Sequence, residues 1–266
     1  MKGQSLDALC AALGYAMGIE APKHASDPSD VLCEYIDACL GKGGVDRIFM
    51  YNPDAIGQWI YEKYSDLVQE ARKRVDIEVY FDTVMPSVTP VCFATMYTGA
   101  GPSVHGIQSY VKPVITIDTL FDALLRCGKK PAIVSTSNDS MSKIFLCRDM
   151  DYYIYDSIEE VNSKAAELIR EDKYDFIAVY NGNYDTVMHK YGPESSEALL
   201  ELSNNVKAFC EFDSMIEQNW KKHNTLIGFA MDHGCHEIDG GCGSHGLDMK
   251  EDINIVHLYK IHTAQG

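Results

Sequence analysis

The sequence predicts an α/β fold in which a mainly parallel central sheet carries helices on both faces. Two observations support this prediction: strand-like and helix-like segments alternate along the chain, and several strands are continuous apolar runs, such as FIAVY at 176–180. Strands that are apolar on both faces are typical of parallel sheets covered on both sides. The length of 266 residues suits one large domain of this class.

The first 44 residues are expected to form an extra helical segment that packs on this domain. Ser5 can cap a first helix whose apolar residues recur on one face. A second helix is expected from residue 28 or 29 to about residue 40, because Gly41 follows as a stop signal. The segment either covers the sheet or serves as an oligomerisation arm, and both interpretations stay open.

The expected domain spans residues 45–266 and alternates the two kinds of element. Short apolar runs predict strands at 47–51, 77–81, 131–135, 152–155, 176–180, 225–230 and 253–261. Longer stretches with helical periodicity predict helices at 55–75, 118–127, 158–171 and 195–223, and a short one is expected at 91–97. This alternation brings the ends of successive strands to a common edge of the sheet.

The charge and composition exclude several function classes. With 23 basic and 39 acidic residues, the chain carries a net charge of −16, which disfavours nucleic-acid polymers and anionic membranes as partners. No apolar run is long enough to predict a membrane span, and the start of the chain does not resemble a signal peptide. The nine cysteines are odd in number and irregularly spaced, so a reduced, cytoplasmic protein is expected.

Side chains with catalytic or metal-binding chemistry follow the predicted strands. They are Asp54 after 47–51, Thr89 after 77–81, Asp185 and His189 after 176–180, and Asp232, His233 and the loop residue His245 after 225–230. Because ligands of open α/β sheets bind beyond the carboxyl ends of the strands, we expect these side chains at one edge. Carboxylate and imidazole donors suit zinc, manganese or a similar divalent ion, and six ligands are enough for two ions.

Each of these residues also has an ordinary structural interpretation. Asp54 alone could be the N-cap of the following helix, and Thr89 before Pro90 could be a common loop threonine. Asp185 and His189 could be an exposed polar pair on one helical face. The site hypothesis depends on the coincidence that five separate segments deliver such residues to the same edge.

Short motifs occur in a fixed order along the chain: PSVTP at 86–90, DTVMHKYGPES at 185–195, DHG at 232–234 and GSHG at 243–246. This ordered set resembles the alkaline phosphatase superfamily, and most closely its nucleotide pyrophosphatase/phosphodiesterase branch. The resemblance covers residues 46–260. It implies an alkaline phosphatase-like catalytic domain whose cap region, at about residues 108–174, is short and reduced.

The resemblance also implies a chemistry. Thr89 would be the nucleophile and would form a phosphothreonine intermediate. The cofactors would be two divalent ions, usually zinc, with manganese as the alternative. The implied activity is hydrolysis of a small-molecule phosphate ester at a phosphodiester or pyrophosphate bond. The implied metal ligands fall into two sets of three: Asp185, His189 and His245, and Asp54, Asp232 and His233.

Two places near the implied substrate depart from that branch. Pro90 follows Thr89 where the relatives have an aromatic residue that stacks on a base, and Phe93 is the nearest aromatic. Tyr110 or Lys112 stands near the place of an asparagine that holds a phosphoryl oxygen in the relatives. We therefore expect Phe93, Tyr110 and Lys112 to contact the substrate, and a preference for nucleotides stays open.

Other activities fit the same residues. A phosphomonoesterase, a phosphonate hydrolase or a phosphomutase would use the same core, and the sequence does not separate them. Outside enzymes, the alternative is a non-catalytic metal-binding protein that keeps the fold. The sequence leaves the oligomeric state open.

Overall fold

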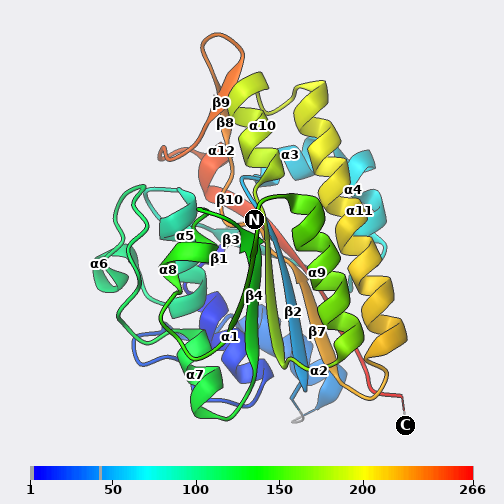
Figure 1. Cartoon of the computed structure of the whole chain (residues 1–266). Coiled ribbons are helices and arrows are strands. Elements are labelled where there is room, and N and C mark those ends of the chain that lie inside the picture. Colours follow the sequence, from blue (N-terminus) through cyan, green and yellow to red (C-terminus); the bar gives the residue numbers. More distant parts are fainter. Residues whose placement is uncertain (1–2, 42–43, 266) are drawn as a thin grey trace.

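The computed structural model describes residues 3–41 and 44–265 and has a mixed eight-stranded sheet at its centre (Figure 1). In their order across the sheet, the strands are β1 (Gln4–Ser5), β3 (Ile77–Asp82), β10 (Asn254–His262), β7 (Thr225–Phe229), β2 (Arg47–Pro53), β6 (Phe176–Asn181), β4 (Pro131–Thr136) and β5 (Asp151–Tyr155). The two pairs made by β10 are antiparallel, and the other neighbouring pairs are parallel. The predicted mainly parallel sheet is confirmed, with one antiparallel strand inside it.

Helices cover both faces of this sheet (Figure 1). On one face α11 packs against α4 and α9, and on the other α1, α5, α7 and α8 pack together. The described helices are α1 (Ala8–Ala16), α2 (Asp30–Leu40), α3 (Gln58–Lys63), α4 (Ser65–Arg72), α5 (Thr89–Thr98), α6 (Pro102–His105), α7 (Leu120–Arg126), α8 (Met141–Ile144), α9 (Ile158–Glu171), α10 (Asn183–Tyr191), α11 (Ser196–Asn219) and α12 (Lys250–Ile253).

Buried aromatic side chains fill both interfaces between the sheet and the helices. On one face, the Phe212 ring of α11 lies 5.2 Å from Phe49 and 5.7 Å from Tyr51 of β2, measured between ring centroids. On the other face, the Tyr97 ring of α5 lies 6.2 Å from Phe176 of β6. Strands β2 and β6 are buried along their whole length, as the apolar runs within them predicted.

Local capping signals account for two helices that the sequence predicted well. The α9 helix occupies the predicted range, and the Ser157 side chain accepts a hydrogen bond from the Glu160 N–H at its start. The α2 helix begins after Ser29, whose side chain accepts from the Leu32 N–H. It ends at Gly41, which has a φ of 63° that glycine adopts without strain.

Two predictions about helices are wrong. Ser5 does not cap a helix, because it lies in β1 with its backbone paired to Asp82 of β3. The predicted helix at 55–75 is divided into α3 and α4 at Tyr64, where the backbone leaves the helical region (φ −102°, ψ 43°). The Tyr64 hydroxyl donates to Glu194 at 2.7 Å, a distant contact that local periodicity does not reveal.

The N-terminal segment packs on the rest of the chain. Strand β1 extends the sheet beside β3, and α1 packs against α5 and α7. Region 108–174, expected as a reduced cap, contributes β4, β5, α7, α8 and α9 to the main layers. The division into an N-terminal extension and a catalytic domain stays a prediction.

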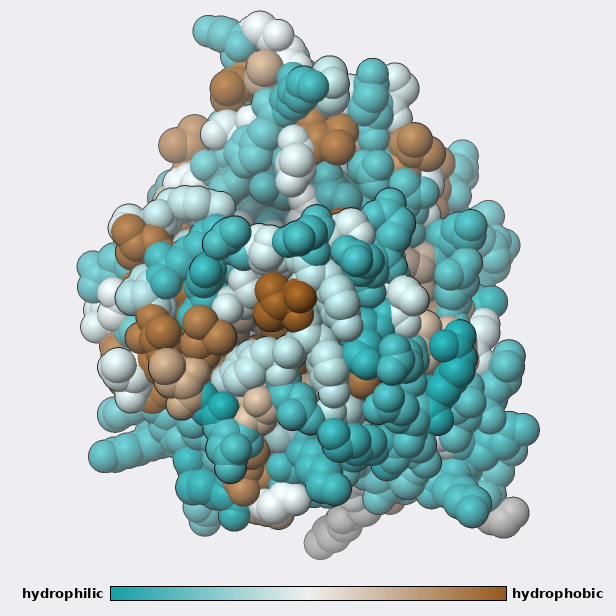
Figure 2. All heavy atoms as spheres, viewed as in Figure 1, coloured by the Kyte–Doolittle hydropathy of each residue, from teal (hydrophilic) through white to brown (hydrophobic). Residues whose placement is uncertain are grey.

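The parallel strands β2, β6 and β7 end at the same edge of the sheet. A two-stranded hairpin of β8 (His236–Ile238) and β9 (Cys242–Ser244) stands beside α10 above this edge (Figure 1). Figure 2 shows a largely hydrophilic face on which hydrophobic residues gather over the region of α6 and α8. Within residues 3–41 and 44–265, no helix has the length and hydrophobicity that a membrane crossing requires.

Candidate metal centre

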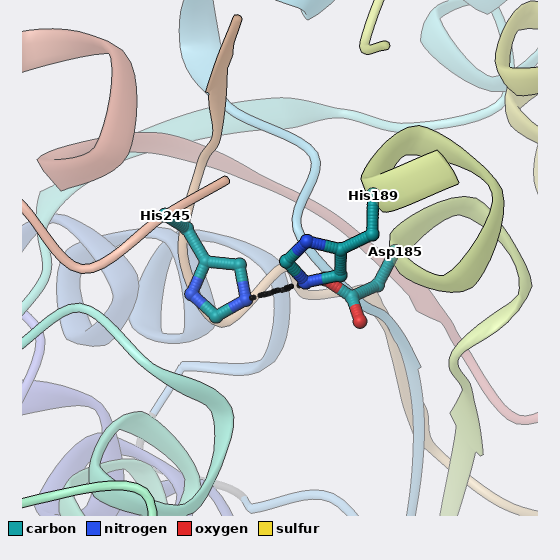
Figure 3. A group of neighbouring side chains, drawn as sticks. All are labelled: Asp185, His189 and His245. Carbon is teal, nitrogen blue, oxygen red and sulfur yellow. Dashed lines mark hydrogen bonds and ion pairs between the residues drawn. The ribbon is translucent and has the colours of Figure 1, made fainter. Parts of the chain in front are cut away.

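The first group of three ligands lies on α10 and on the loop after the hairpin. Asp185 and His189 are one helical turn apart, so both side chains point from the same side of α10 toward His245 (Figure 3). His189 Nε2 lies 3.1 Å from His245 Nε2. Asp185 Oδ1 lies 3.2 Å from His189 Nε2 and 3.4 Å from His245 Nε2. Three ligand atoms from two segments therefore converge.

The second group is buried at the ends of β2 and β7. Asp54 follows β2 directly, and Asp232 and His233 follow β7. His233 Nε2 lies 3.3 Å from Asp54 Oδ1 and 3.3 Å from Asp232 Oδ2, and the three side chains are at most 1% exposed. The rings of His233 and His245 lie 4.2 Å apart between centroids, so the two groups adjoin.

The spacing of these atoms fits metal coordination. Ligand atoms about 2.1 Å from a tetrahedral zinc ion lie about 3.4 Å from one another. The separations that involve a histidine nitrogen are 3.1 to 3.4 Å in both groups. One oxygen of each carboxylate, namely Asp54 Oδ1, Asp185 Oδ1 and Asp232 Oδ2, is buried with no hydrogen-bond partner among the described residues. A buried carboxylate oxygen needs a donor or a cation, so both groups fit a divalent ion.

Backbone carbonyls determine which nitrogen each histidine offers. A carbonyl oxygen can only accept, so an Nδ1 that contacts one carries the proton, and Nε2 keeps a free lone pair. Such hydrogen bonds orient imidazole ligands in metal sites. Each Nδ1 donates to a carbonyl: His189 to Gly243 at 2.9 Å, His233 to Gly234 at 2.9 Å and His245 to Ser87 at 3.1 Å.

Burial controls the protonation of these groups. It raises the pKa of Asp54 well above its usual value, and the charge of Asp232 raises it further. Burial also raises the pKa of Asp232 to about 7 and lowers the pKa of His233. Burial acts in the same direction on Asp185, but the neighbouring imidazoles of His189 and His245 outweigh it and lower the pKa of that carboxyl. A bound cation would favour the ionised carboxylates and relieve this unfavourable concentration of negative charge.

The Thr89 hydroxyl lies against the second group. Thr89 is the first residue of α5, and its side chain is buried. Its Oγ1 lies 3.2 Å from His233 Nε2 and 3.3 Å from Asp54 Oδ2. Pro90 occupies the first turn of α5, where its fixed φ suits the start of a helix. The structure thus brings the predicted nucleophile to the predicted ligand groups.

The three expected substrate contacts lie in different environments. Tyr110 and Lys112 line a cavity of about 520 Å³ together with Asp185 of the first group. Phe93 does not: its ring is fully buried, 5.5 Å from the Tyr180 ring between centroids. Phe93 lies on the core side of α5, so it has no surface to offer a substrate.

Sequence reasoning missed Tyr180. Its hydroxyl donates a short hydrogen bond to Asp54 Oδ2, and its side chain is buried. The tyrosine belongs to the apolar run FIAVY and therefore looked like a core residue. The available signal was its place near the carboxyl end of β6, just ahead of the segment that carries Asp185.

Comparisons with known proteins show which solved structures have a similar fold. No protein-family model and no curated protein matches the sequence. Among solved structures, murine ectonucleotide pyrophosphatase/phosphodiesterase 5 matches with a TM-score of 0.64 and 13% identity, over 80% of this chain and 88% of that one. An inactive variant of that protein in complex with AMP matches with a TM-score of 0.61 and 12% identity, over 81% and 88% of the two chains.

A structure of phosphonoacetate hydrolase from Sinorhizobium meliloti 1021 in complex with phosphonoacetate also matches. Its TM-score is 0.56 at 16% identity, over 74% of this chain and 59% of that one. The chain has the alkaline phosphatase-like fold. The resemblance found in the ordered motifs is thereby confirmed at the level of the fold.

Proposed function

We propose that this protein hydrolyses phosphate esters, at phosphodiester or pyrophosphate bonds, with two divalent metal ions and a phosphothreonine intermediate at Thr89. The observation that carries the proposal is the Thr89 hydroxyl, which lies within 3.3 Å of the side chains of Asp54 and His233 in one of two adjoining three-ligand groups. The fold shared with a nucleotide pyrophosphatase/phosphodiesterase supports it.

The proposed ligands divide between two ions. Zinc suits the carboxylate and imidazole donors best, and manganese is the alternative. When bound, the ions would supply positive charge that stabilises a threonine alkoxide and the phosphoryl oxygens. One would be held by Asp185, His189 and His245, and the other by Asp54, Asp232 and His233.

The chain's own groups account for the covalent steps. Thr89 Oγ1 would release its proton to solvent and attack phosphorus in line, so that a new O–P bond forms while the bond to the leaving alkoxide breaks, and the alkoxide takes a proton from water. The α5 helix begins at Thr89, and the positive end of its dipole favours the transferred anion there. Water would then cleave the phosphothreonine, releasing the phosphoryl product and restoring the hydroxyl.

A phosphonate hydrolase is the second candidate. It is favoured by the structural similarity to phosphonoacetate hydrolase. A phosphomonoesterase or a phosphomutase would use the same residues. The substrate panel described next also tests for a phosphomonoesterase, because it contains an aryl monophosphate. The expected cytoplasmic location stays a prediction.

The test is a substrate panel with zinc or manganese added. The panel contains a bis-aryl phosphate, an aryl monophosphate, a nucleoside monophosphate aryl ester and phosphonoacetate. We expect the diesters to be hydrolysed fastest by the wild type. Thr89→Ala should abolish turnover, whereas Thr116→Ala, at an exposed position outside the site, should retain it. Undiminished turnover by Thr89→Ala would remove the nucleophile from the proposal, and a preference for monoester or phosphonoacetate would favour the alternatives.

A further inference from the structure

A polar cleft leads away from the candidate metal centre. The cavity of about 520 Å³ that contains Asp185 and Tyr180 adjoins a second cavity of about 500 Å³. The two share Ile158, Asn183 and Glu201 in their walls. A substrate whose phosphoryl group lies at the metal ligands can therefore extend one of its alcohol groups past Asn183 and Glu201.

The charge along this cleft is predominantly negative. Apart from Asp185, its carboxylates are Asp139, Asp156, Glu159, Glu201 and Glu211, and its amines are Lys112 and Lys207. Lys112 is held at one rim, where its Nζ donates to the Asn138 carbonyl at 2.8 Å. Lys207 is exposed and lies 3.9 Å from Glu211. An additional anionic group on the substrate would therefore meet like charge along most of the cleft.

The amide side chains of the cleft offer acceptors. Asn183 Nδ2 donates to Glu201 Oε2 at 2.6 Å, which determines the orientation of the amide and leaves Asn183 Oδ1 buried without a partner among the described residues. Asn181 is 1% exposed, and its Nδ2 donates to the Tyr51 hydroxyl, so its Oδ1 is likewise buried and unpartnered in the described structure. Both asparagines line the second cavity.

Buried acceptors without partners are costly, and a ligand that donates hydrogen bonds would satisfy them. Since a carboxylate, Glu201, lies against Asn183 and lines the same cavity as Asn181, a positively charged donor fits better than a neutral hydroxyl. A protonated amine has three N–H donors and the matching charge.

We infer that the cleft takes an alcohol group carrying a protonated amine, so that the substrates are phosphodiesters of amino alcohols rather than esters that bear further anionic groups. This inference rests on the proposed hydrolase function. It assigns Glu201 and Asn183 to substrate selection, whereas the six metal ligands and Thr89 serve every ester alike.

A matched series of para-nitrophenyl phosphodiesters tests the inference. Besides para-nitrophenyl, each diester carries an aminopropyl, a butyl or a carboxyethyl group. The leaving group and the reacting bond therefore stay the same, while the charge of the group that would lie in the cleft changes. In the metal-loaded enzyme we expect kcat/KM to be about tenfold higher for the aminopropyl ester than for the butyl ester, and lowest for the carboxyethyl ester.

Variants connect the preference with the cleft. Glu201→Gln should reduce the ratio of aminopropyl to butyl kcat/KM to about twofold or less, because it removes the charge that pairs with the amine. Asp156→Asn, at an exposed position in the wall, should reduce it by a smaller factor. Glu197→Gln removes an exposed charge from the same helix outside the cleft and should leave the ratio unchanged.

The outcomes separate the two proposals. Equal rates for the three wild-type reactions, or a preference for the carboxyethyl ester, would overturn the amine inference and leave the hydrolase function standing. If Glu201→Gln and Asp156→Asn each kept the full preference for the aminopropyl ester, this would show that the cleft does not recognise the amine. Failure to hydrolyse any of the esters would overturn the proposed function, and the inference with it.

Discussion

Tyr180 is the residue outside the six proposed ligands that bears most directly on the centre. Its hydroxyl donates to Asp54 Oδ2, while Asp54 Oδ1 faces His233 Nε2 at 3.3 Å. The hydrogen bond therefore holds one carboxylate oxygen and turns the other toward the position of an ion. Removing such an orienting partner typically weakens metal binding by about 10- to 100-fold.

We therefore expect Tyr180→Phe to weaken zinc binding by about tenfold or more. Competition with a chromophoric chelator measures this directly and does not require a substrate. Tyr191→Phe is the matched control, because Tyr191 is 45% exposed. Equal zinc affinity in the wild type and in Tyr180→Phe would show that the hydroxyl does not position Asp54.

His257 provides a second prediction at the scale of single residues. Its Nε2 donates to the Met231 carbonyl at 2.6 Å, and its Nδ1 accepts from the Tyr259 hydroxyl at 2.9 Å. Complete burial lowers the pKa of His257 to about 4, from the ordinary histidine value of 6.5. The unfolded chain thus binds this proton more readily than the folded protein does. The contribution of neutral His257 to the free energy of unfolding is therefore fully present above pH 6.5 and is lost as the pH falls toward 4.

Between pH 7 and pH 5.5 the wild type should lose about 1 kcal/mol of unfolding free energy through His257. His257→Gln should show a pH dependence that is smaller by this amount, even though the substitution lowers stability at every pH. Urea unfolding at the two pH values measures the difference, and the exposed His24→Gln is the control. The same pH dependence in His257→Gln and the wild type would contradict a neutral, buried imidazole.

The sequence predicts single residues well where chemistry and position coincide. Asp54, Thr89 and Asp232 each follow a strand, so the edge rule for open sheets found them. Phe93 proved to be a core residue and Tyr180 a partner of Asp54, because which side of an element faces the core depends on tertiary packing. Neither position differs from ordinary core sequence by its local pattern.

At the scale of elements, α11 shows how one side chain begins a long helix. The Ser195 Oγ accepts from the Ala198 N–H at 3.1 Å and donates to the Gly192 carbonyl at 2.9 Å. Ser195→Ala should lower the unfolding free energy by about 1 kcal/mol, because the hydroxyl satisfies an N–H at the helix end.

The neighbouring serine is a matched control for this substitution. Ser196 is exposed, lies inside the helix and contacts Glu197 rather than the helix end. Denaturant titration should therefore detect a loss in Ser195→Ala and almost none in Ser196→Ala. Equal stabilities of the two variants would mean that the capping bond contributes nothing measurable.

The bounds of helices and strands were predictable where local sequence signals determine them, and not where they depend on contacts with distant parts of the chain. The ranges of α9 and α2 follow from serine caps and a terminal glycine. The antiparallel direction of β10 does not, because a strand's sequence pattern is compatible with either direction. The break at Tyr64 is not visible in the local pattern either, and the Tyr64 hydroxyl contacts Glu194, which lies 130 positions away.

At the scale of the whole molecule, the candidate centre joins parts that are distant in the chain. Its residues come from the end of β2, the start of α5, α10, the end of β7 and the loop after the hairpin. Three carboxylates, two of them buried, meet there in a chain that already carries a net charge of −16. Ion binding would neutralise this repulsion and hold these segments together, so it should stabilise the whole fold rather than one loop.

We expect zinc at about 100 times its dissociation constant to add about 2.7 kcal/mol, equivalent to a rise in melting temperature of about 5–10 °C. Without metal, Asp232→Asn should melt at the same temperature as the wild type or higher, because the substitution removes a buried charge. With zinc, however, it should lose most of the rise in melting temperature. Asp239→Asn, in the exposed turn of the hairpin, should keep the full zinc effect. Differential scanning calorimetry with and without a chelator measures all three proteins. A zinc effect of the same size in Asp232→Asn would show that the ion binds elsewhere.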